Sequence, residues 1–592
     1  MTTPQESSLK RYNRFLLLVS GLGGLLYGVD VGIISGALPY LQATSDLTSG
    51  QLSNVVAAVL LGSVISTLFA GLLADWMGRK PMMAVSGLLF SASIPIIALS
   101  HGYGALVLGR LLQGVSAGFI GVVIPLYLAE CLGAKDRGKG TGVFQWLLTA
   151  GFVVAALISI YFSYRVEAVS KLNDPAMLLA FKDTAWRSVF WVSLPPGLIF
   201  FLGSLKVAES PRWLHKRGRR DDAKVALLRS RTPEQAETEL SEMDATALAE
   251  QAGHGSLASG VKESLLRRKY VIPFVLACVI LACNQATGIN SIIGYNTTIL
   301  LQGGLSDLQA HWGSFVFTIV NFLITMIGVS LVDKKGRKFL LSLGSAGIIV
   351  SLLVVGFLFH RTDSQRIDCH EAVQGIVTTD QTAKIDFNAV YQKALLTAAG
   401  PAGAALDGKP ATLIVIYSYG DFRSASKLVR SDDTGTITIT RASLPETKVE
   451  AFFSNPFADL AAARTAPLKI ENAILTPIPT EQNGWMTLIA CLFFMAFFAV
   501  GPGVCVWLAL SELMPTRIRS NGMSIALLIN QAVATTIAAV FLPTVGKYGY
   551  STMFFIFAGA TVVYFVTAAF FLPETKGKTL EEIEAHFDKA KA

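Results

Sequence analysis

The chain has 592 residues, of which 52% are hydrophobic and 15% are charged, and its mean hydropathy is +0.52. A composition this apolar excludes a water-soluble globular protein of this length and predicts an integral membrane protein in contact with a lipid bilayer. The net charge of +8 does not indicate nucleic-acid binding, because the Lys and Arg residues lie in short segments between apolar runs. The six cysteines show no metal-ligand or disulfide spacing, so no metal and no other cofactor is expected.

The first apolar run, residues 15–38, is long enough to cross a bilayer but carries a carboxylate, Asp30, near its middle. An acid inside a membrane span is costly and is a functional-site hypothesis. The alternative is an Asp at the end of a loop, but apolar residues continue for two turns on both sides of it. The run has no convincing small-residue cleavage site, so it is interpreted as an uncleaved first span rather than a signal peptide.

Lys and Arg residues cluster in alternate links between the apolar segments, beginning at the N-terminus. By the positive-inside rule both termini are then cytoplasmic, in what we expect to be a bacterial inner membrane. Twelve segments have spanning length: about 15–38, 51–74, 81–100, 105–129, 142–163, 187–207, 271–300, 311–332, 339–359, 485–510, 521–545 and 551–572.

An internal repeat relates the two halves of the chain. The link Gly71–Lys80 after the second span reappears as Gly328–Lys338 after the eighth, with its Asp, Gly, Arg and Lys displaced by 258 residues. An acid and an arginine seven residues apart recur at a displacement of 382, as Glu130 with Arg137 and Glu512 with Arg519. The two displacements differ by 124 residues, which is the length of the polar stretch 361–484. Two six-helix halves are therefore expected, with one insertion in the second.

The predicted fold class is an all-α membrane protein of twelve transmembrane helices in two six-helix bundles, with an inserted extracytoplasmic β-rich domain. The inserted stretch alternates apolar and polar residues at 412–419, 434–440 and 448–453, which predicts strands, whereas a disordered linker is the alternative. The expected segments are 1–207 (first bundle), 208–269 (cytoplasmic linker with short amphipathic helices), 270–360 (spans seven to nine), 361–484 (inserted domain) and 485–592 (spans ten to twelve and the tail).

Several further motifs accompany the repeated links, and as a set they are highly specific. They are Glu209-Ser-Pro-Arg-Trp213, Pro573-Glu-Thr-Lys-Gly577, Gly109-Arg110, Gln285-Ala-Thr-Gly-Ile-Asn290, Gly501-Pro-Gly503 and Trp507. With these motifs the chain resembles the sugar porter family of the major facilitator superfamily, and among its members the bacterial proton-coupled monosaccharide symporters. The match covers nearly the whole chain except 361–484. It implies two bundles with a sugar site between them and alternating access.

The resemblance also implies which residues contact the sugar. Amides both donate and accept hydrogen bonds, as sugar hydroxyls do, and an indole offers an apolar face to a pyranose ring. Any single amide could instead join two helices in lipid. Asn284 stands where the family usually has a glutamine, and Gln531 where it often has an aromatic residue, which leaves the identity of the sugar open. The implied sugar-contacting positions are Gln145, Gln285, Asn290, Asn321, Trp507 and Asn530.

The repeated charged links are predicted to form a cytoplasmic gate, since Asp can pair with Arg across neighbouring helix ends. Such pairs are expected to form only when the cytoplasmic ends of the halves meet. The predicted gate residues are Asp75, Arg79, Glu130, Arg137, Glu209 and Arg212 in the first half, and Asp333, Arg337, Glu512, Arg519 and Glu574 in the second.

Depth in the membrane predicts that Asp30 lies beside Arg110 inside the first bundle. At about 1.5 Å per residue, both lie roughly 8–10 Å below the outer face of the bilayer core. An acid that loses this partner during the transport cycle would take up a proton, so the leading hypothesis is proton-coupled symport of a monosaccharide. A facilitated uniporter, a transporter-like sugar receptor and a drug-proton antiporter remain as alternatives, and an enzyme has the least support. The expected partners are a small sugar and a proton.

Overall fold

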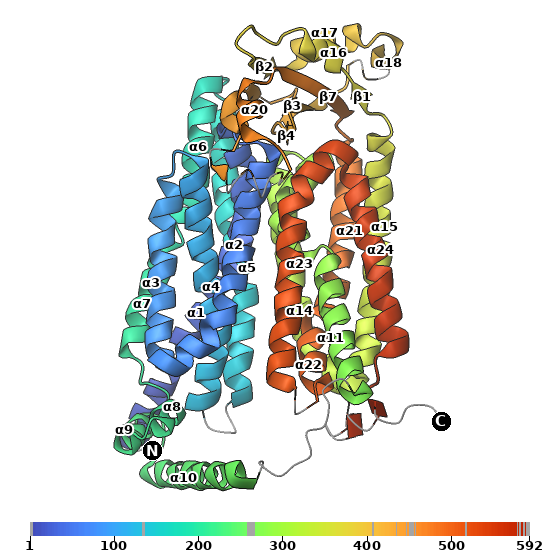
Figure 1. Cartoon of the computed structure of the whole chain (residues 1–592). Helices are drawn as coiled ribbons and strands as arrows, with labels where there is room; N and C mark the ends of the chain where they lie inside the picture. Colours follow the sequence, from blue (N-terminus) through green and yellow to red (C-terminus); the bar gives the residue numbers. More distant parts are fainter. Residues whose placement is uncertain are drawn as a thin grey trace.

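A computed structural model provides the structure of the protein (Figure 1). It describes residues 4–132, 137–256, 267–404, 408–433, 435–445, 457–515 and 518–576, together with 406, 447–448, 451, 455, 578, 582–583 and 586–587. Within this part of the chain, twelve segments are long and apolar enough to cross a membrane. This confirms the number of spans expected from the sequence.

The first half contains six of these spans, and its sixth is interrupted. That span begins at Pro175 rather than near 187, because the Asp174 side chain caps a helix there by accepting hydrogen bonds from the N–H groups of Ala176 and Met177. The helices are α1 (Pro4–Thr44), α2 (Ser49–Met77), α3 (Arg79–Ala98), α4 (Tyr103–Cys131), α5 (Arg137–Ser170), α6 (Pro175–Trp191) and α7 (Leu194–Lys206).

Three helices follow in the linker: α8 (Pro211–Lys216), α9 (Arg220–Leu228) and α10 (Pro233–Ser256). The second half is interrupted in its seventh and tenth spans, each of which was expected to be continuous. Its helices are α11 (Arg268–Ala286), α12 (Ile289–Gly294), α13 (Asn296–Gln302), α14 (Asp307–Lys335), α15 (Arg337–Asp363), α21 (Glu481–Val500), α22 (Pro502–Leu513), α23 (Arg519–Tyr548), α24 (Tyr550–Val566) and the π-helical turn η3 (Thr567–Phe571).

The stretch between α15 and α21, residues 361–484, is called the inserted segment from here on. Its central strand β3 (Ala411–Tyr419) is buried along its whole length and pairs antiparallel with β7 (Leu468–Pro477), β4 (Phe422–Ala425) and β5 (Val429–Arg430). The strand β1 (Ile367–Asp368) extends the sheet beside β7. A second sheet pairs β2 (Ala383–Phe387) with β6 (Gly435–Ile439).

Helices accompany these strands, so the inserted segment is a mixed α/β structure rather than the β-rich one expected. The strands predicted at 412–419 and 434–440 correspond to β3 and β6. Lys448 and Ala451, the described residues of the third predicted strand, are helical, so that prediction was wrong. A hydrophobic core that includes Phe387 and Leu413 lies within the segment. The helical elements are α16 (His370–Gln374), α17 (Ala389–Ala398), α18 (Pro401–Ala404), η2 (Arg441–Ser443) and α20 (Leu460–Thr465).

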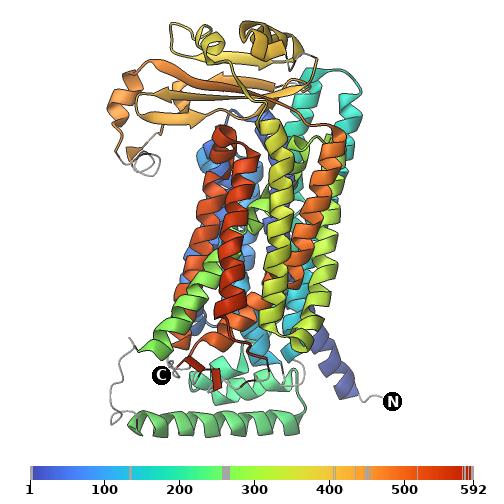
Figure 2. The same ribbon diagram turned by 90° about the vertical axis from the view of Figure 1, so that its right-hand side faces the viewer.

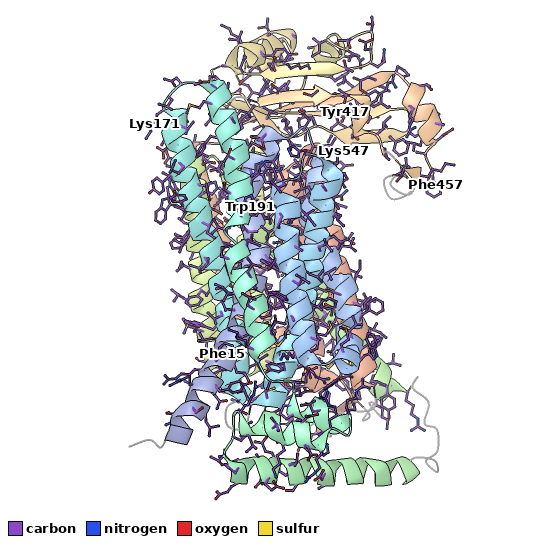
Figure 3. All side chains as sticks on the ribbon, turned by 90° about the vertical axis from the view of Figure 1, so that its left-hand side faces the viewer. Phe15, Lys171, Trp191, Tyr417, Phe457 and Lys547 are labelled. Carbon is purple, nitrogen blue, oxygen red and sulfur yellow. The ribbon has the colours of Figure 1, made fainter. Side chains whose placement is uncertain are left out.

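The inserted segment covers one end of the two bundles, which we call the insert end, and α8–α10 lie at the opposite linker end (Figures 1 and 2). Lys171, Tyr417 and Lys547 lie toward the insert end in Figure 3, and Phe15 lies toward the linker end. The inserted segment is therefore positioned over helices from both halves.

Side chains of the two halves meet directly at the insert end. Ser35 of α1 shares a hydrogen bond of 3.1 Å with Thr297 of α13. The carboxylate of Asp307, at the start of α14, accepts hydrogen bonds from Tyr40 at 2.8 Å and from Ser163 at 2.6 Å. Since Asp307 belongs to the second half and its two donors to the first, these bonds hold the insert ends of the halves together.

Candidate functional site

The seventh span breaks at Gly288, between α11 and α12. Gly288 has φ +82°, in the left-handed region, and a Cβ there would lie 2.4 Å from the Phe557 ring. Both observations require glycine at this position. The break brings Gln285 and Asn290 together. Interrupted helices of this kind commonly form substrate sites in secondary transporters.

Three of the predicted sugar-contacting amides form one hydrogen-bonded chain at this break. Asn290 donates to Gln285 Oε1 at 2.7 Å, and Gln285 donates through Nε2 to Asn530 Oδ1 at 3.1 Å. Asn530 is fully buried in α23 and donates in turn to the backbone carbonyl of Leu281 at 2.9 Å. The chain fixes the orientation of each amide. Asn290 is only half-buried, so its remaining acceptor can face a ligand.

A cavity lies between the two halves, and Ile293, three residues after Asn290, lines it, whereas the three amides of the chain are not among its lining residues. Asn321 of α14, a predicted contact, lines it. So does Asn296 of α13, a buried amide whose side-chain nitrogen and oxygen both lack a partner in the described structure. Asn296 is not among the residues predicted from the sequence, although it lies six residues after Asn290 in the same motif-bearing span. The other polar lining side chains are Ser35, Ser159, Ser314 and Thr318.

Two predicted contacts lie apart from this arrangement. Gln145 is on an exposed part of α5 and contributes only its backbone carbonyl to a described hydrogen bond, with Thr149. The Trp507 side chain lies outside the described residues. Trp507 belongs to α22, which follows the break at Gly501, where a Cβ would lie 2.4 Å from the Leu340 carbonyl oxygen.

Asp30 and Arg110 meet inside the first half, as the depth argument predicted. Asp30 Oδ1 lies 3.6 Å from Arg110 Nη1, and both side chains are 1% exposed. Arg110 also donates to Gln113 at 2.6 Å and lies over the Phe190 ring at 5.7 Å. Neither oxygen of Asp30 has a hydrogen-bond partner among the described residues. The carboxylate charge is therefore compensated by one guanidinium at the outer limit of an ion pair.

The charged residues at the linker end of the first half converge on Arg79. The Arg79 guanidinium binds Glu130 at 2.7 Å and Asp75 at 3.0 Å. The other Glu130 oxygen accepts a short hydrogen bond from Ser210. Glu209 accepts the N–H groups of Arg79 and Ser210, at 3.0 and 2.7 Å. Burial raises the pKa of Glu209, and the N–H groups of Ser210, Lys80 and Arg79 partly offset that effect.

The second half repeats this cluster. Arg337 binds Glu512 at 3.0 Å, Thr575 donates to the other Glu512 oxygen at 2.6 Å, and Glu574 accepts the Arg337 N–H at 3.1 Å. Sequence reasoning omitted the hydroxyl residues Ser210 and Thr575, although a hydroxyl residue follows the acid in both motifs.

The two clusters correct one expectation. The pairs of Arg79 with Glu130 and of Arg337 with Glu512 lie within single halves, so they form without the two linker ends meeting. Arg212 is exposed and takes part in no ion pair of the described structure. The side chains of the predicted gate residues Arg137, Asp333 and Arg519 lie outside the described residues.

The chain is similar to characterised transporters along nearly its whole length. It is 26% identical over 589 residues to a proton myo-inositol cotransporter of Homo sapiens, covering 99% of this chain and 83% of that protein. It is 24% identical over 589 residues to a galactose-proton symporter of Escherichia coli (strain K12), covering 99% and 97%.

Comparison of structures gives the same fold. The xylose transporter XylE from E. coli, in a partially occluded inward-open conformation, superposes with a TM-score of 0.61 at 18% identity, covering 95% of this chain and 100% of that chain. The family described as "Sugar (and other) transporter" matches residues 16–379 and 469–587. The chain therefore belongs to this sugar transporter family.

Proposed function

We propose that this protein carries a monosaccharide, or a ring of similar size and hydroxylation, across a cell membrane together with a proton. The observation that carries the proposal is the cavity between the halves. Asn296 and Asn321 of the second half line it, and so do Gly32 and Ser35 of α1, the helix of the first half that carries the buried Asp30. The proton-coupled relatives that cover almost the whole chain support the same reading.

The substrate site lies between the halves, where the cavity is lined by amides and hydroxyls. A neutral polyol suits this lining, because each hydroxyl donates and accepts as an amide does. No charged side chain lines the described cavity, which argues against an ionic substrate. Gln285, Asn290, Asn530 and Asn321 hold the substrate, and Gln145 and Trp507 approach it in another conformation of the cycle. Transport requires the cavity to open to each side in turn.

Asp30 couples the proton. Its α1 neighbours Gly32, Ser35 and Gly36 line the cavity, so a substrate that shifts α1 also shifts Asp30 relative to Arg110. The Arg110 guanidinium stabilises the negative charge of the Asp30 carboxylate. A buried acid that loses such a cation binds a proton instead. Proton binding and substrate movement are then parts of one rearrangement.

The linker end faces the cytoplasm, with both termini, and the inserted segment lies outside the cell. The alternation of Lys and Arg residues supports this orientation. The clusters around Arg79 and Arg337 brace the helices of each half, so that each half moves as a unit. We also propose that the other predicted gate residues help to close the linker end. These are Arg137, Arg212, Asp333 and Arg519.

The test is proton uptake during sugar entry. Purified protein in liposomes, without any imposed gradient, is given D-xylose, D-galactose, D-glucose or myo-inositol in turn while external pH and radiolabel entry are recorded. Symport predicts that each substrate that enters makes the external medium more alkaline. Entry without a pH change supports the facilitated uniporter instead. Entry of none of the four would contradict the proposed substrate class.

A further inference from the structure

The part of the inserted segment that faces the first half lies outside the match to the family model. The family match stops at residue 379 and resumes at 469, so residues 380–468 lie outside it. This stretch includes residues 426–433, which follow β4, contain β5 and are called the strap from here on. The strap contacts both halves of the transporter.

The inserted segment is firmly rooted in the second half. Asp363, at the end of α15, accepts hydrogen bonds from the N–H and hydroxyl of Ser551, at 2.9 and 2.6 Å. Arg366 forms an ion pair with Asp363 at 3.3 Å and donates to the Val545 carbonyl at the end of α23. Burial lowers the pKa of Arg366, and the Asp363 carboxylate opposes that effect. These bonds make the segment move with the second half.

The strap also binds the backbone of the turn between α1 and α2 in the first half. Lys427 is only 7% exposed, and its ammonium group donates to the Ser45 carbonyl at 2.7 Å. Gln42 donates in the other direction, to the Leu428 carbonyl at 2.9 Å. The Lys427 ammonium group is removed from water and is held by carbonyl oxygens of the first half. If the strap moved away from the turn, both the ammonium group and these carbonyl oxygens would lose their hydrogen-bond partners.

An ion pair and a hydroxyl complete the attachment. Lys182 of α6 lies 2.9 Å from both carboxylate oxygens of Asp433, and the lysine side chain is 10% exposed. Ser49, in the first turn of α2, donates to the Ser426 carbonyl at 2.5 Å. The first half thus contributes groups from α1, α2 and α6, all at the insert end.

The strap lies where the halves already touch. The Tyr295 hydroxyl of the second half donates to the Ala538 carbonyl at 3.0 Å and shares a hydrogen bond of 3.3 Å with Ser53 of α2, and Ser35 is bonded to Thr297. Opening the cavity at this end requires the insert ends of the halves to separate. A segment fixed to one half and bonded to the other resists that separation.

We propose that the strap is a latch that stabilises the state closed at the insert end and must release in each transport cycle. This inference rests on the alternating access proposed above. It predicts that the strap sets how often the cavity opens to the outside, while the substrate site itself is unchanged. Charge-assisted hydrogen bonds supply much of the attachment, so their loss raises the population of the open state.

The first test measures opening without any sugar. Ser35→Cys places a thiol at a buried contact between the halves, and a membrane-impermeant maleimide reports how often it is exposed from outside. Adding Lys182→Met and Lys427→Met should raise the labelling rate about tenfold, since the loss of charge-assisted bonds is worth a factor of that order. The matched control is Arg423→Gln, which removes an ion pair with Glu471 inside the inserted segment and should leave the rate unchanged.

Protein with its natural Ser35 gives the background from the six native cysteines. Equal labelling rates with and without the two lysine substitutions would overturn the latch. Because no substrate is used, this result does not depend on the identity of the sugar.

A second test fixes the latch in place. In a variant with Ser49→Cys and Ser426→Cys, oxidation should form a disulfide that joins the strap to the first half. This disulfide should stop exchange of any of the four test sugars that the parent protein carries. Reduction of the disulfide should restore exchange. The control pair, Ile414→Cys with Gly546→Cys, joins the inserted segment to the half that already holds it and should leave exchange intact. Full exchange by protein cross-linked at 49 and 426 would overturn the proposal.

Discussion

Gln285 and Asn530 are joined by a side-chain hydrogen bond of 3.1 Å, although 245 residues separate them in the sequence. The bond ties the end of α11, beside the helix break, to the middle of α23. The bond uses the side-chain nitrogen of Gln285, and the side-chain oxygen of Gln285 accepts a hydrogen bond from Asn290 at 2.7 Å. The orientation of three amides in the second half thus depends on one side chain.

Replacing that side chain tests the substrate site. Gln285→Ala should weaken sugar binding at least about tenfold, because one lost buried amide leaves its partners unsatisfied at a cost of roughly 1–3 kcal/mol. Binding is measured by thermal shift with the sugar panel, since a ligand specific for the folded state raises its apparent stability. Gln365→Ala, an exposed amide near the end of α15, is the control and should bind as wild type does. Unchanged affinity in Gln285→Ala would remove this site from the proposal.

The helix break at Gly288 makes a separate prediction. Gly288→Ala should lower both the melting temperature and sugar affinity, because a left-handed φ of +82° costs an alanine about 1–2 kcal/mol and its Cβ meets the Phe557 ring. Gly559→Ala in α24 is the control: a Cβ there has no neighbour within 4 Å, so the change should be neutral or slightly stabilising. Equal melting temperatures for the two variants would contradict the argument.

The sequence predicted the parts of the fold that depend on local pattern. Length and hydropathy were enough for twelve spans, and helix rise was enough to bring Asp30 and Arg110 to one level, where they lie 3.6 Å apart. The helix breaks at Gly288 and Gly501 were not predicted. Glycine is required at 288 because the Phe557 ring lies close to it, and at 501 because the Leu340 carbonyl does. Both neighbours are distant in the sequence, so local pattern does not reveal them.

The attachment of the inserted segment to the first half was also beyond sequence reasoning. Lys427, Gln42 and Ser49 bind backbone carbonyl groups, and a carbonyl acceptor has no residue signature. Among the predicted strands, the run at 448–453 failed because alternation over so few residues also fits a short helix, and Ala451 is indeed helical and buried. Lys182 lies before the sixth span expected at 187–207, but that span begins at Pro175 and includes it.

The two linker-end arginines should differ in their effect on stability. Arg79 and Glu130 are 7% and 12% exposed in their side chains, whereas Arg337 and Glu512 are 13% and 25% exposed. Removing one partner of a buried pair costs about 3–5 kcal/mol, and solvent reduces the cost. Arg79→Ala should therefore lower the melting temperature more than Arg337→Ala. The reverse order, measured by intrinsic fluorescence in detergent, would contradict the view that these pairs brace single halves.

Deleting the inserted segment separates its role from that of the bundles. We expect that replacing residues 367–478 with a short Gly/Ser linker retains sugar uptake, because the described cavity is lined entirely by helices of the two halves. The retained Asp363 and Arg366 keep their bonds to α23 and α24. The control is wild type reconstituted at the same density. Loss of uptake in a correctly inserted deletion variant would show that the segment is required for the cycle.

The most direct test of the proton-coupling proposal is the Asp30→Asn variant in proteoliposomes, compared with the exposed control Asp380→Asn. An amide cannot take up a proton at this position, yet it keeps the size of the side chain. Accumulation of sugar against its gradient, driven by an imposed proton gradient, should be lost in Asp30→Asn and kept in Asp380→Asn. Exchange of labelled for unlabelled sugar should persist in both. Proton-driven accumulation by Asp30→Asn at the rate of wild type would contradict the assignment of Asp30 as the coupling residue.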